Sequence, residues 1–214
     1  MTINLHILNA RGTLTPYIKT IESIFNNTIN KITKKVQISN IDIIIADNLD
    51  NTIPEIGIGG YVPNANLIYI SLNPKHPRFK ISLNEDLDRT LTHEIHHCIR
   101  WKSKNYGTSL LEAIIWEGLA DHFEIEISNK KPEPWSIALS KKQIKIFLEK
   151  AKKEFSNKKY NHEAWFFGDK NKKIPRWTAY SLGFYLVDQY LKKYPQKKPS
   201  QLYNIEAKEF ANLI

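Results

Sequence analysis

The hydrophobic residues of this chain recur at two periods, one typical of helices and the other of strands. Isoleucines at helical spacing predict a helix over residues 16–35, with Thr15 as its N-cap and Pro16 at its first position. The pattern then changes to short runs of β-branched residues at 36–38 and 41–45, which predict strands. The start of the chain therefore combines a helix with strands.

Turn-forming residues dominate the next segment. Glycine, proline and asparagine at residues 47–66 predict a long connection, with room for a short strand at 57–61. The hydrophobic run at 67–72 predicts a clearer strand, which Pro74 helps to end. Most of the predicted strands therefore lie within the first third of the chain.

Capping residues mark the helices that follow. Asn84 is the expected N-cap of a helix over residues 85–102, and the acidic residues in its first turn favour a helix N-terminus. Ser109 and Glu112 have the spacing of a capping box, which predicts that the next helix begins near residue 110. These two helices follow each other after a short link.

The last third of the chain is expected to be mainly helical. Ser140 is the predicted N-cap of an amphipathic helix, and residues 177–190 form another, whose hydrophobic stripe includes Tyr180. Ser200 begins a short final helix, whereas residues 156–175 are polar and irregular.

Strands in the first half and helices in the second indicate an α+β fold. A small mixed β-sheet is expected near the N-terminus, followed by a mainly helical C-terminal part. The length of 214 residues suits one domain, with a sheet and first-helix part at 1–108 and a helical part at 109–214.

Composition adds a charge imbalance. The net charge is +9, and residues 141–198 hold sixteen basic and five acidic side chains, so the rest of the chain carries −2. The lysines are scattered and no nucleic-acid-binding motif accompanies them, which favours a solvated surface over a nucleic-acid interface. No hydrophobic run reaches the ~18 residues of a membrane span, and the N-terminus lacks the basic start of a signal peptide, so a cytoplasmic protein is expected.

The most specific chemical pattern is His93-Glu94-Ile95-His96-His97. On the predicted helix, His93 and His97 lie one turn apart on the same face, where they can share one Zn²⁺. Glu94, next to the first histidine, can then act as a general base on a water molecule that the metal holds. The pattern predicts one zinc ion per chain, although Mn²⁺ or Co²⁺ could substitute.

The next helix supplies the remaining groups. Catalytic zinc is held by three protein ligands and keeps one open position. Glu117, twenty residues after the second histidine, is the expected third ligand. Asp121 lies one turn further on and is expected to accept the ring N–H of a ligand histidine, His93.

With these residues in place, the chain resembles a family of predicted zinc-dependent proteases of the gluzincin type. The resemblance covers residues 84–190 and is strongest at 93–97 and 110–121, with further likeness at 165–168 and 175–183. It implies a zincin-like fold and zinc-dependent peptidase activity, in which an edge strand of the sheet lies over the active-site helix.

Such an enzyme also needs a way to bind substrate and a donor to the oxyanion. In many zinc peptidases the strand before the metal helix is a sheet edge that pairs with the substrate main chain, so residues 67–72 are expected to bind a peptide or protein. Tyr180 is the first candidate for the oxyanion donor, with His162 and Tyr185 as alternatives. A tyrosine on a hydrophobic stripe can equally serve in packing.

Two neighbours in the motif are assigned no metal role. His96 is expected to be a partly exposed residue on the helix surface. Cys98 is expected to be a small buried residue. Because it is the single cysteine, the chain cannot form an internal disulfide.

Two other functions remain open beside zinc-dependent hydrolysis of peptide bonds. One is a catalytically silent zinc module that acts through protein contacts, but a purely structural site has no need of a base such as Glu94. The other is a basic nucleic-acid-associated protein with a metal site, whose affinity for nucleic acid would fall steeply with salt.

Overall fold

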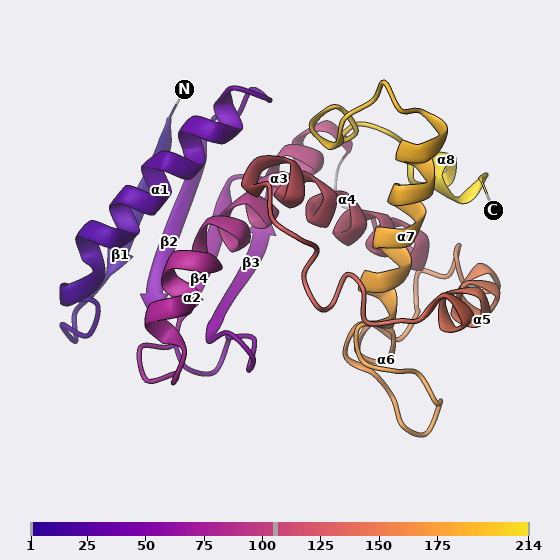
Figure 1. Ribbon diagram of the computed structural model, residues 1–214, viewed down its shortest axis with the longest axis horizontal. Helices are drawn as coiled ribbons and strands as arrows, with labels where there is room; N and C mark the ends of the chain where they lie inside the picture. The colour runs from indigo at the N-terminus through magenta and orange to yellow at the C-terminus, as the bar shows by residue number, and fades with distance from the viewer. Residues whose placement is uncertain (1, 105–106, 214) are drawn as a thin grey trace. The chain divides into compact units, whose positions relative to one another are not determined.

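The computed structural model describes residues 2–104 and 107–213. The chain divides into two compact units, Met1–Lys102 and Ser103–Ile214 (Figure 1). The described residues form a small four-stranded sheet in the first unit and helices in both, which confirms the predicted α+β class. The single-domain organisation stays a prediction.

The first unit is built on a mixed sheet. Its strands are β1 (Ile3–Leu8), β2 (Ile41–Asp47), β3 (Ile58–Asn64) and β4 (Leu67–Leu72), in the spatial order β1-β2-β4-β3. β2 runs parallel to both β1 and β4, whereas β3 is antiparallel to β4. β1 was not predicted, and the strand predicted at 36–38 is absent from the described residues.

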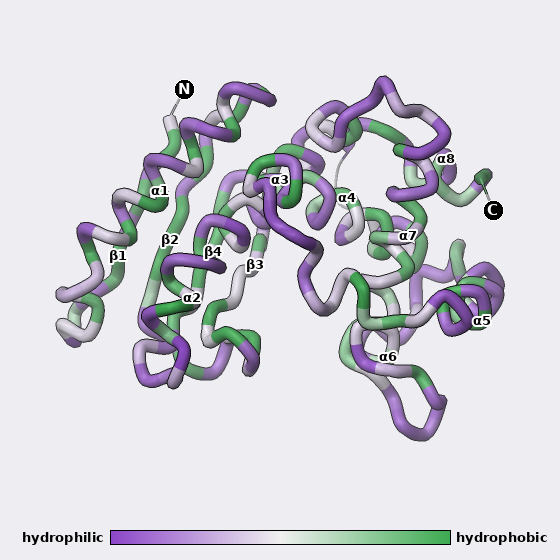
Figure 2. The backbone as a smooth tube through the Cα atoms, in the orientation of Figure 1, coloured by the Kyte–Doolittle hydropathy of each residue, from purple (hydrophilic) through white to green (hydrophobic). Residues whose placement is uncertain are grey.

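Helices of the first unit cover one face of this sheet. Alternate residues of β2 are buried or more exposed, and Ile43 and Ile45 lie in register with the buried Ile68 and Ile70 of β4. In Figure 2, β2 runs mostly green, as a strand at the centre of a core does. Alternation of this kind is typical of a sheet that packs on a hydrophobic core through one face.

The helix predicted at 16–35 is present as α1 (Ile18–Thr33), after a short 3₁₀ helix, η1 (Thr15–Tyr17). Thr15 is therefore inside η1, and its prediction as the N-cap of the long helix is wrong. Asn9 provides the side-chain acceptor at this turn, because its Oδ1 accepts a hydrogen bond from the Leu14 N–H at 2.9 Å.

The position of β4 corrects the expectation about substrate binding. Its bounds are those predicted, 67–72, but it lies between β2 and β3 and is not an edge. Its main-chain groups are paired on both sides, which leaves no free side for a peptide. The edge next to it is β3, which looks like a loop in the sequence because it contains Gly59, Gly60 and Pro63.

The predicted metal helix is α3 (Leu87–Lys104), and a separate short helix, α2 (Phe79–Glu85), precedes it. Asn84 is not an N-cap, since it belongs to α2 and its side-chain amide donates to the Lys80 carbonyl at 2.7 Å. The sequence pattern missed α2 because its hydrophobic side is only two turns long.

The first two helices of the second unit both begin with a capping box. In α4 (Leu110–Ser128), Ser109 Oγ accepts from the Glu112 N–H, as expected. The N-cap Ser140 does the same for α5 (Lys141–Lys152). In Figure 2, purple marks much of α5, in keeping with its many lysines.

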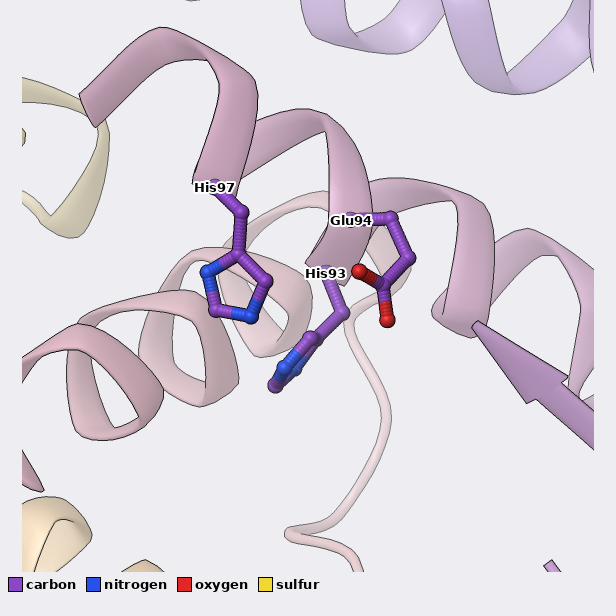
Figure 3. A group of neighbouring side chains, drawn as sticks. All are labelled: His93, Glu94 and His97. Carbon is purple, nitrogen blue, oxygen red and sulfur yellow. The ribbon is translucent and has the colours of Figure 1, made fainter. Parts of the chain in front are cut away.

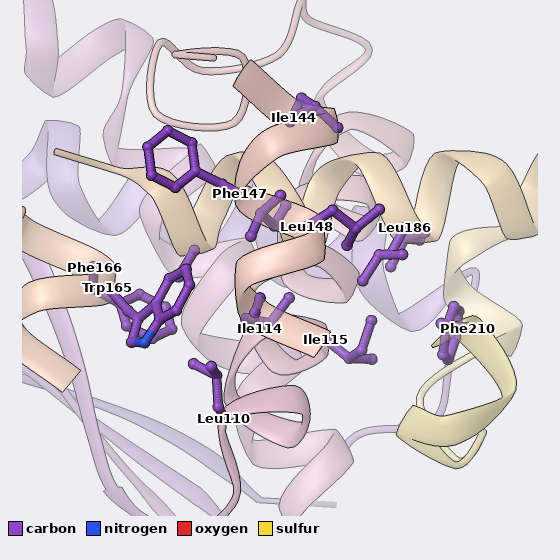
Figure 4. Packing of buried hydrophobic residues seen from close by; sticks show 14 of the residues in the cluster. Leu110, Ile114, Ile115, Ile144, Phe147, Leu148, Trp165, Phe166, Leu186 and Phe210 are labelled. Carbon is purple, nitrogen blue, oxygen red and sulfur yellow. The ribbon is translucent and has the colours of Figure 1, made fainter. Parts of the chain in front are cut away.

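Helices α4 and α7 (Thr178–Lys193) cross at two glycines. A Cβ on Gly118 would lie 2.8 Å from Gly183 Cα and closer still to the Gly183 carbonyl, so only glycine allows this approach. The core around the crossing, shown in Figure 4, includes Leu110, Ile114, Ile115, Ile144, Phe147, Leu148, Trp165, Phe166, Leu186 and Phe210.

Three short elements complete this unit: α6 (His162–Phe167), η2 (Pro199–Gln201) and α8 (Ala207–Ala211). The polar surroundings of α6 hid it in the sequence, although Asn161 caps it by accepting from the Ala164 N–H at 3.0 Å. Among the described residues, none of the helices combines the length and hydrophobicity needed to cross a membrane.

Candidate metal centre

Helix α3 brings together two histidines and a glutamate. The ring centroids of His93 and His97 are 4.6 Å apart, with their planes at 83°. One possible ligand atom from each of His93, Glu94 and His97 lies within 4.8 Å of the other two. Figure 3 shows the two rings and the carboxylate on the same side of the helix. The helical repeat places His93 and His97 on one face of α3, as the motif predicted.

This set of donors fits a zinc ion. Imidazole nitrogen and carboxylate oxygen are zinc ligands, and two nitrogens on one ion lie no more than about 4 Å apart. The candidate ligand atoms on α3 lie within 4.8 Å of one another, which is close to that limit before any ring rotates. His97 and Glu94 are buried and His93 is half-buried, so water screens their charges less than it would on an open surface.

Cys98 takes no part in this group. Its side chain is fully buried, with Sγ 3.9 Å from the Asn64 carbonyl oxygen. Burial raises the pKa of the Cys98 thiol to about 12, so the thiol stays protonated at neutral pH. The prediction of a small buried residue is confirmed.

The prediction for His96 is wrong, because its side chain is only 1% exposed. Helix α3 is buried on more than one side: Ile95 and Ile99 are covered as well as Glu94 and His97. A residue between those two faces therefore also loses contact with solvent.

Helix α4 places Asp121 in a buried hydrogen bond that the sequence did not reveal. Ser136 Oγ donates to Asp121 Oδ2 at 2.7 Å, and both residues are 2% exposed. Ser136 lies in a proline-containing segment fifteen residues later, and no motif marks it. Glu117 is half-buried one turn before Asp121. The roles of Glu117 as a metal ligand and of Asp121 as the acceptor of the His93 ring N–H stay predictions.

The two best candidates for the oxyanion donor flank one aromatic ring. The Tyr180 ring meets Phe166 edge-on at 5.1 Å, and His162 stacks on the same Phe166 at 4.2 Å. The Tyr160 hydroxyl forms a 3.1 Å hydrogen bond with His162 Nδ1, which orients the imidazole. The second unit therefore brings Tyr180 and His162 together.

His162 also lies within the electrostatic influence of Glu117. Burial lowers the pKa of His162, and the carboxylates of Glu117 and Glu163 oppose that shift. The fully buried hydrophobic residues of α7 are Ala179, Leu182, Leu186 and Val187, so Tyr180 lies beside the core face and not at its centre. Tyr185 is half-buried further along α7.

Comparison with known proteins bears on this group of residues. A family model described as Predicted Zn-dependent protease (DUF2268) matches residues 19–212. No curated protein and no solved structure matches the chain. Since the family match spans α3, α4 and nearly the whole sequence, the protein belongs to the family of predicted Zn-dependent proteases.

Proposed function

We propose that the protein is a zinc metallopeptidase of the gluzincin type with a zincin-like fold. The observation that carries this proposal is the convergence of His93, Glu94 and His97 within 4.8 Å on α3. Membership of the family supports both the metal and the reaction class. Glu117 on α4 is the proposed third ligand, because catalytic zinc takes three protein ligands and leaves Glu94 for a different task.

Each residue then has a distinct role. Zinc, when bound, lowers the pKa of a coordinated water and polarises a peptide carbonyl. The Glu94 carboxylate accepts a proton from the attacking water and later delivers it to the leaving amine. Asp121 accepts the ring N–H of His93 and so holds the tautomer that presents the other nitrogen to the metal. Ser136, bonded to Asp121, keeps that carboxylate in place.

The oxyanion on the scissile carbonyl needs a hydrogen-bond donor. We propose Tyr180, whose hydroxyl-bearing ring lies beside the core face of α7, with His162 as the alternative. His162 has support of its own, since Tyr160 holds its ring and Glu117 influences its charge. Tyr180→Phe is expected to lower kcat by about 10²–10³ with little change in KM, and His162→Gln tests the alternative in the same assay.

The proposed substrate is an extended peptide or an extended segment of a protein. It would pair with β3 in place of the interior strand β4, because β3 is the free edge nearest to the metal helix. The chain folds back on the first part of β3, where Ile53 forms an isolated bridge with Ile58 and the main chain of residues 51–52 lies against Gly59. The remainder of that edge can accept a strand.

Metal analysis tests the ligands. The wild type is expected to hold about one zinc per chain, and His93→Ala, His97→Ala or Glu117→Ala to lose it. His6→Ala removes an exposed histidine on β1 and is expected to retain the metal. Full zinc content in Glu117→Ala would remove Glu117 from the site without touching the α3 group.

Peptide cleavage tests the enzyme. A peptide library is digested with and without a chelator, and Glu94→Gln is then compared with the wild type on the best peptide. Zinc content is expected to stay intact while cleavage falls by on the order of 10² or more. A wild type that binds zinc but cleaves nothing would support the silent zinc module. Equal rates for wild type and Glu94→Gln would refute the role of Glu94.

A further inference from the structure

Glu94 packs against the main chain of the edge strand. A Cβ built on Gly60 would lie 2.5 Å from Glu94 Cγ and 2.6 Å from Glu94 Cδ, and closer still to Oε1. Real side chains do not approach so closely, so the contact exists only because residue 60 is glycine. Gly60 does not have a positive φ, so alanine could adopt its backbone and the requirement is steric alone.

This contact restricts the position of the Glu94 side chain. A glutamate has three rotatable bonds, and a general base must be held close to the proton that it takes. Glu94 is only 7% exposed, and the Gly60 main chain closes one side of its carboxylate. The edge strand therefore limits where that carboxylate can lie.

The main-chain N–H and C=O groups of Gly60 point away from β4, toward the outer side of β3. The Ile58 carbonyl accepts from the Ile53 N–H at 3.0 Å, on the side away from β4. Alternate residues of a strand direct their N–H and C=O to opposite sides. Gly60, two residues after Ile58, therefore directs both groups away from β4 as well.

We propose that Gly60 is a positioning residue that sets the substrate main chain in register with Glu94. Its missing side chain lets the strand touch the base, and its outward N–H and C=O pair with an extended peptide beside that base. This inference rests on the proposed peptidase function and deepens it, because it names the residue that aligns the cleaved bond.

Gly60→Ala is the direct test. The atoms that its methyl group meets are at the far end of the Glu94 side chain, so the carboxylate shifts and the backbone does not. Folding, zinc content and KM are expected to stay near those of the wild type. The kcat value is expected to fall on the order of 10²-fold, since a misplacement of about 1 Å can cost that much. An unchanged kcat would overturn the proposal.

Two comparisons separate this effect from a general disturbance of the sheet. Tyr69→Ala removes a 40% exposed side chain from the opposite face of β4 and is expected to leave kcat unchanged. In a Glu94→Gln background, Gly60→Ala is expected to cause little further loss, because the base that it displaces is already gone. If the loss of kcat in the double variant equals the product of the losses in the two single variants, Gly60 does not act through Glu94.

The pairing with substrate is tested on the unaltered protein. Peptides methylated at one main-chain nitrogen at a time, around the cleaved bond, are compared for KM and kcat. Methylation of one main-chain nitrogen is expected to raise KM at least tenfold, and methylation of the others is expected to change KM much less. Uniform KM values across the series would refute the pairing at Gly60.

If the wild type cleaves no peptide, the proposed function fails, but the contact between Gly60 and Glu94 can still be tested. A crystal structure of Gly60→Ala is then expected to show the Glu94 carboxylate displaced from its wild-type position. An unmoved carboxylate in that structure would overturn the inference about Gly60.

Discussion

Replacing Ser136 by alanine is expected to weaken the fold and the zinc site together. Ser136 Oγ donates to Asp121 Oδ2 at 2.7 Å, and with both residues 2% exposed no bulk water can replace the lost donor. A hydrogen bond to a charged group contributes about 1.5–3 kcal/mol. For a chain of this size, each kcal/mol shifts Tm by roughly 2–4 °C, so Ser136→Ala is expected to lower Tm by roughly 3–12 °C.

Two other serines calibrate that loss. Ser181 Oγ donates to the Trp135 carbonyl at 2.9 Å and is also buried, but its acceptor is neutral. Ser181→Ala is therefore expected to cost only about 0.5–1.5 kcal/mol. Ser156 is exposed, and Ser156→Ala is expected to stay within about 0.5 kcal/mol of the wild type. Thermal unfolding measures the order of stability of the three variants. The proteins are compared without metal, because bound zinc would add its own stabilisation.

Zinc affinity provides the functional half of this test. If Asp121 orients His93, Asp121→Asn is expected to weaken zinc binding by about 10–100-fold. Ser136→Ala, one hydrogen bond further from the metal, is expected to show a smaller loss in the same direction, and Ser181→Ala none. The reasoning would be refuted if Ser136→Ala matched Ser156→Ala in stability. It would also be refuted if Ser136→Ala and Ser181→Ala changed zinc affinity equally.

Three further predictions concern stability and reactivity. Gly183→Ala is expected to lower Tm, because its Cβ would overlap the Ile114 carbonyl; overpacking of about 1–3 kcal/mol outweighs the ~1 kcal/mol that alanine gains over glycine in a helix, and a raised Tm would contradict this. Cys98, buried with a pKa raised to about 12, is expected to react with a thiol reagent only after denaturation, and rapid labelling of the native protein would contradict its burial. Burial lowers the pKa of His122, whose ring bonds to the Phe184 carbonyl, so the unfolded chain takes up the proton first. Stability in urea is therefore expected to be full above pH ~6.5 and to fall below it, less so in His122→Gln, and parallel pH profiles would refute this.

Local chemistry accounts for what could be predicted from the sequence. The start of α4 follows from Ser109 and Glu112, because a capping box needs only residues three apart. The convergence of His93 and His97 follows from the helical repeat for the same reason. Features of this kind depend on neighbours along the chain, so they can be predicted without knowledge of the rest of the fold.

Errors arose where the local pattern was weak or where tertiary packing competed with it. Asn84 has the chemistry of an N-cap, but the buried side of α2 places it inside a helix. His96 looked like a surface residue, since the sequence does not show that α3 is covered on more than one face.

The edge of the sheet shows most clearly what only the tertiary structure decided. Residues 67–72 were predicted correctly as a strand, but which strands pair is a long-range choice that residue order does not encode locally. β3 took the edge despite its glycines and proline, and one of those glycines, Gly60, lies against Glu94. The bond between Ser136 and Asp121 is of the same kind, because it joins a loop to a helix. The sequence by itself determined that His93 and His97 share one helix face beside Glu94, whereas the packing of distant segments determined what surrounds them.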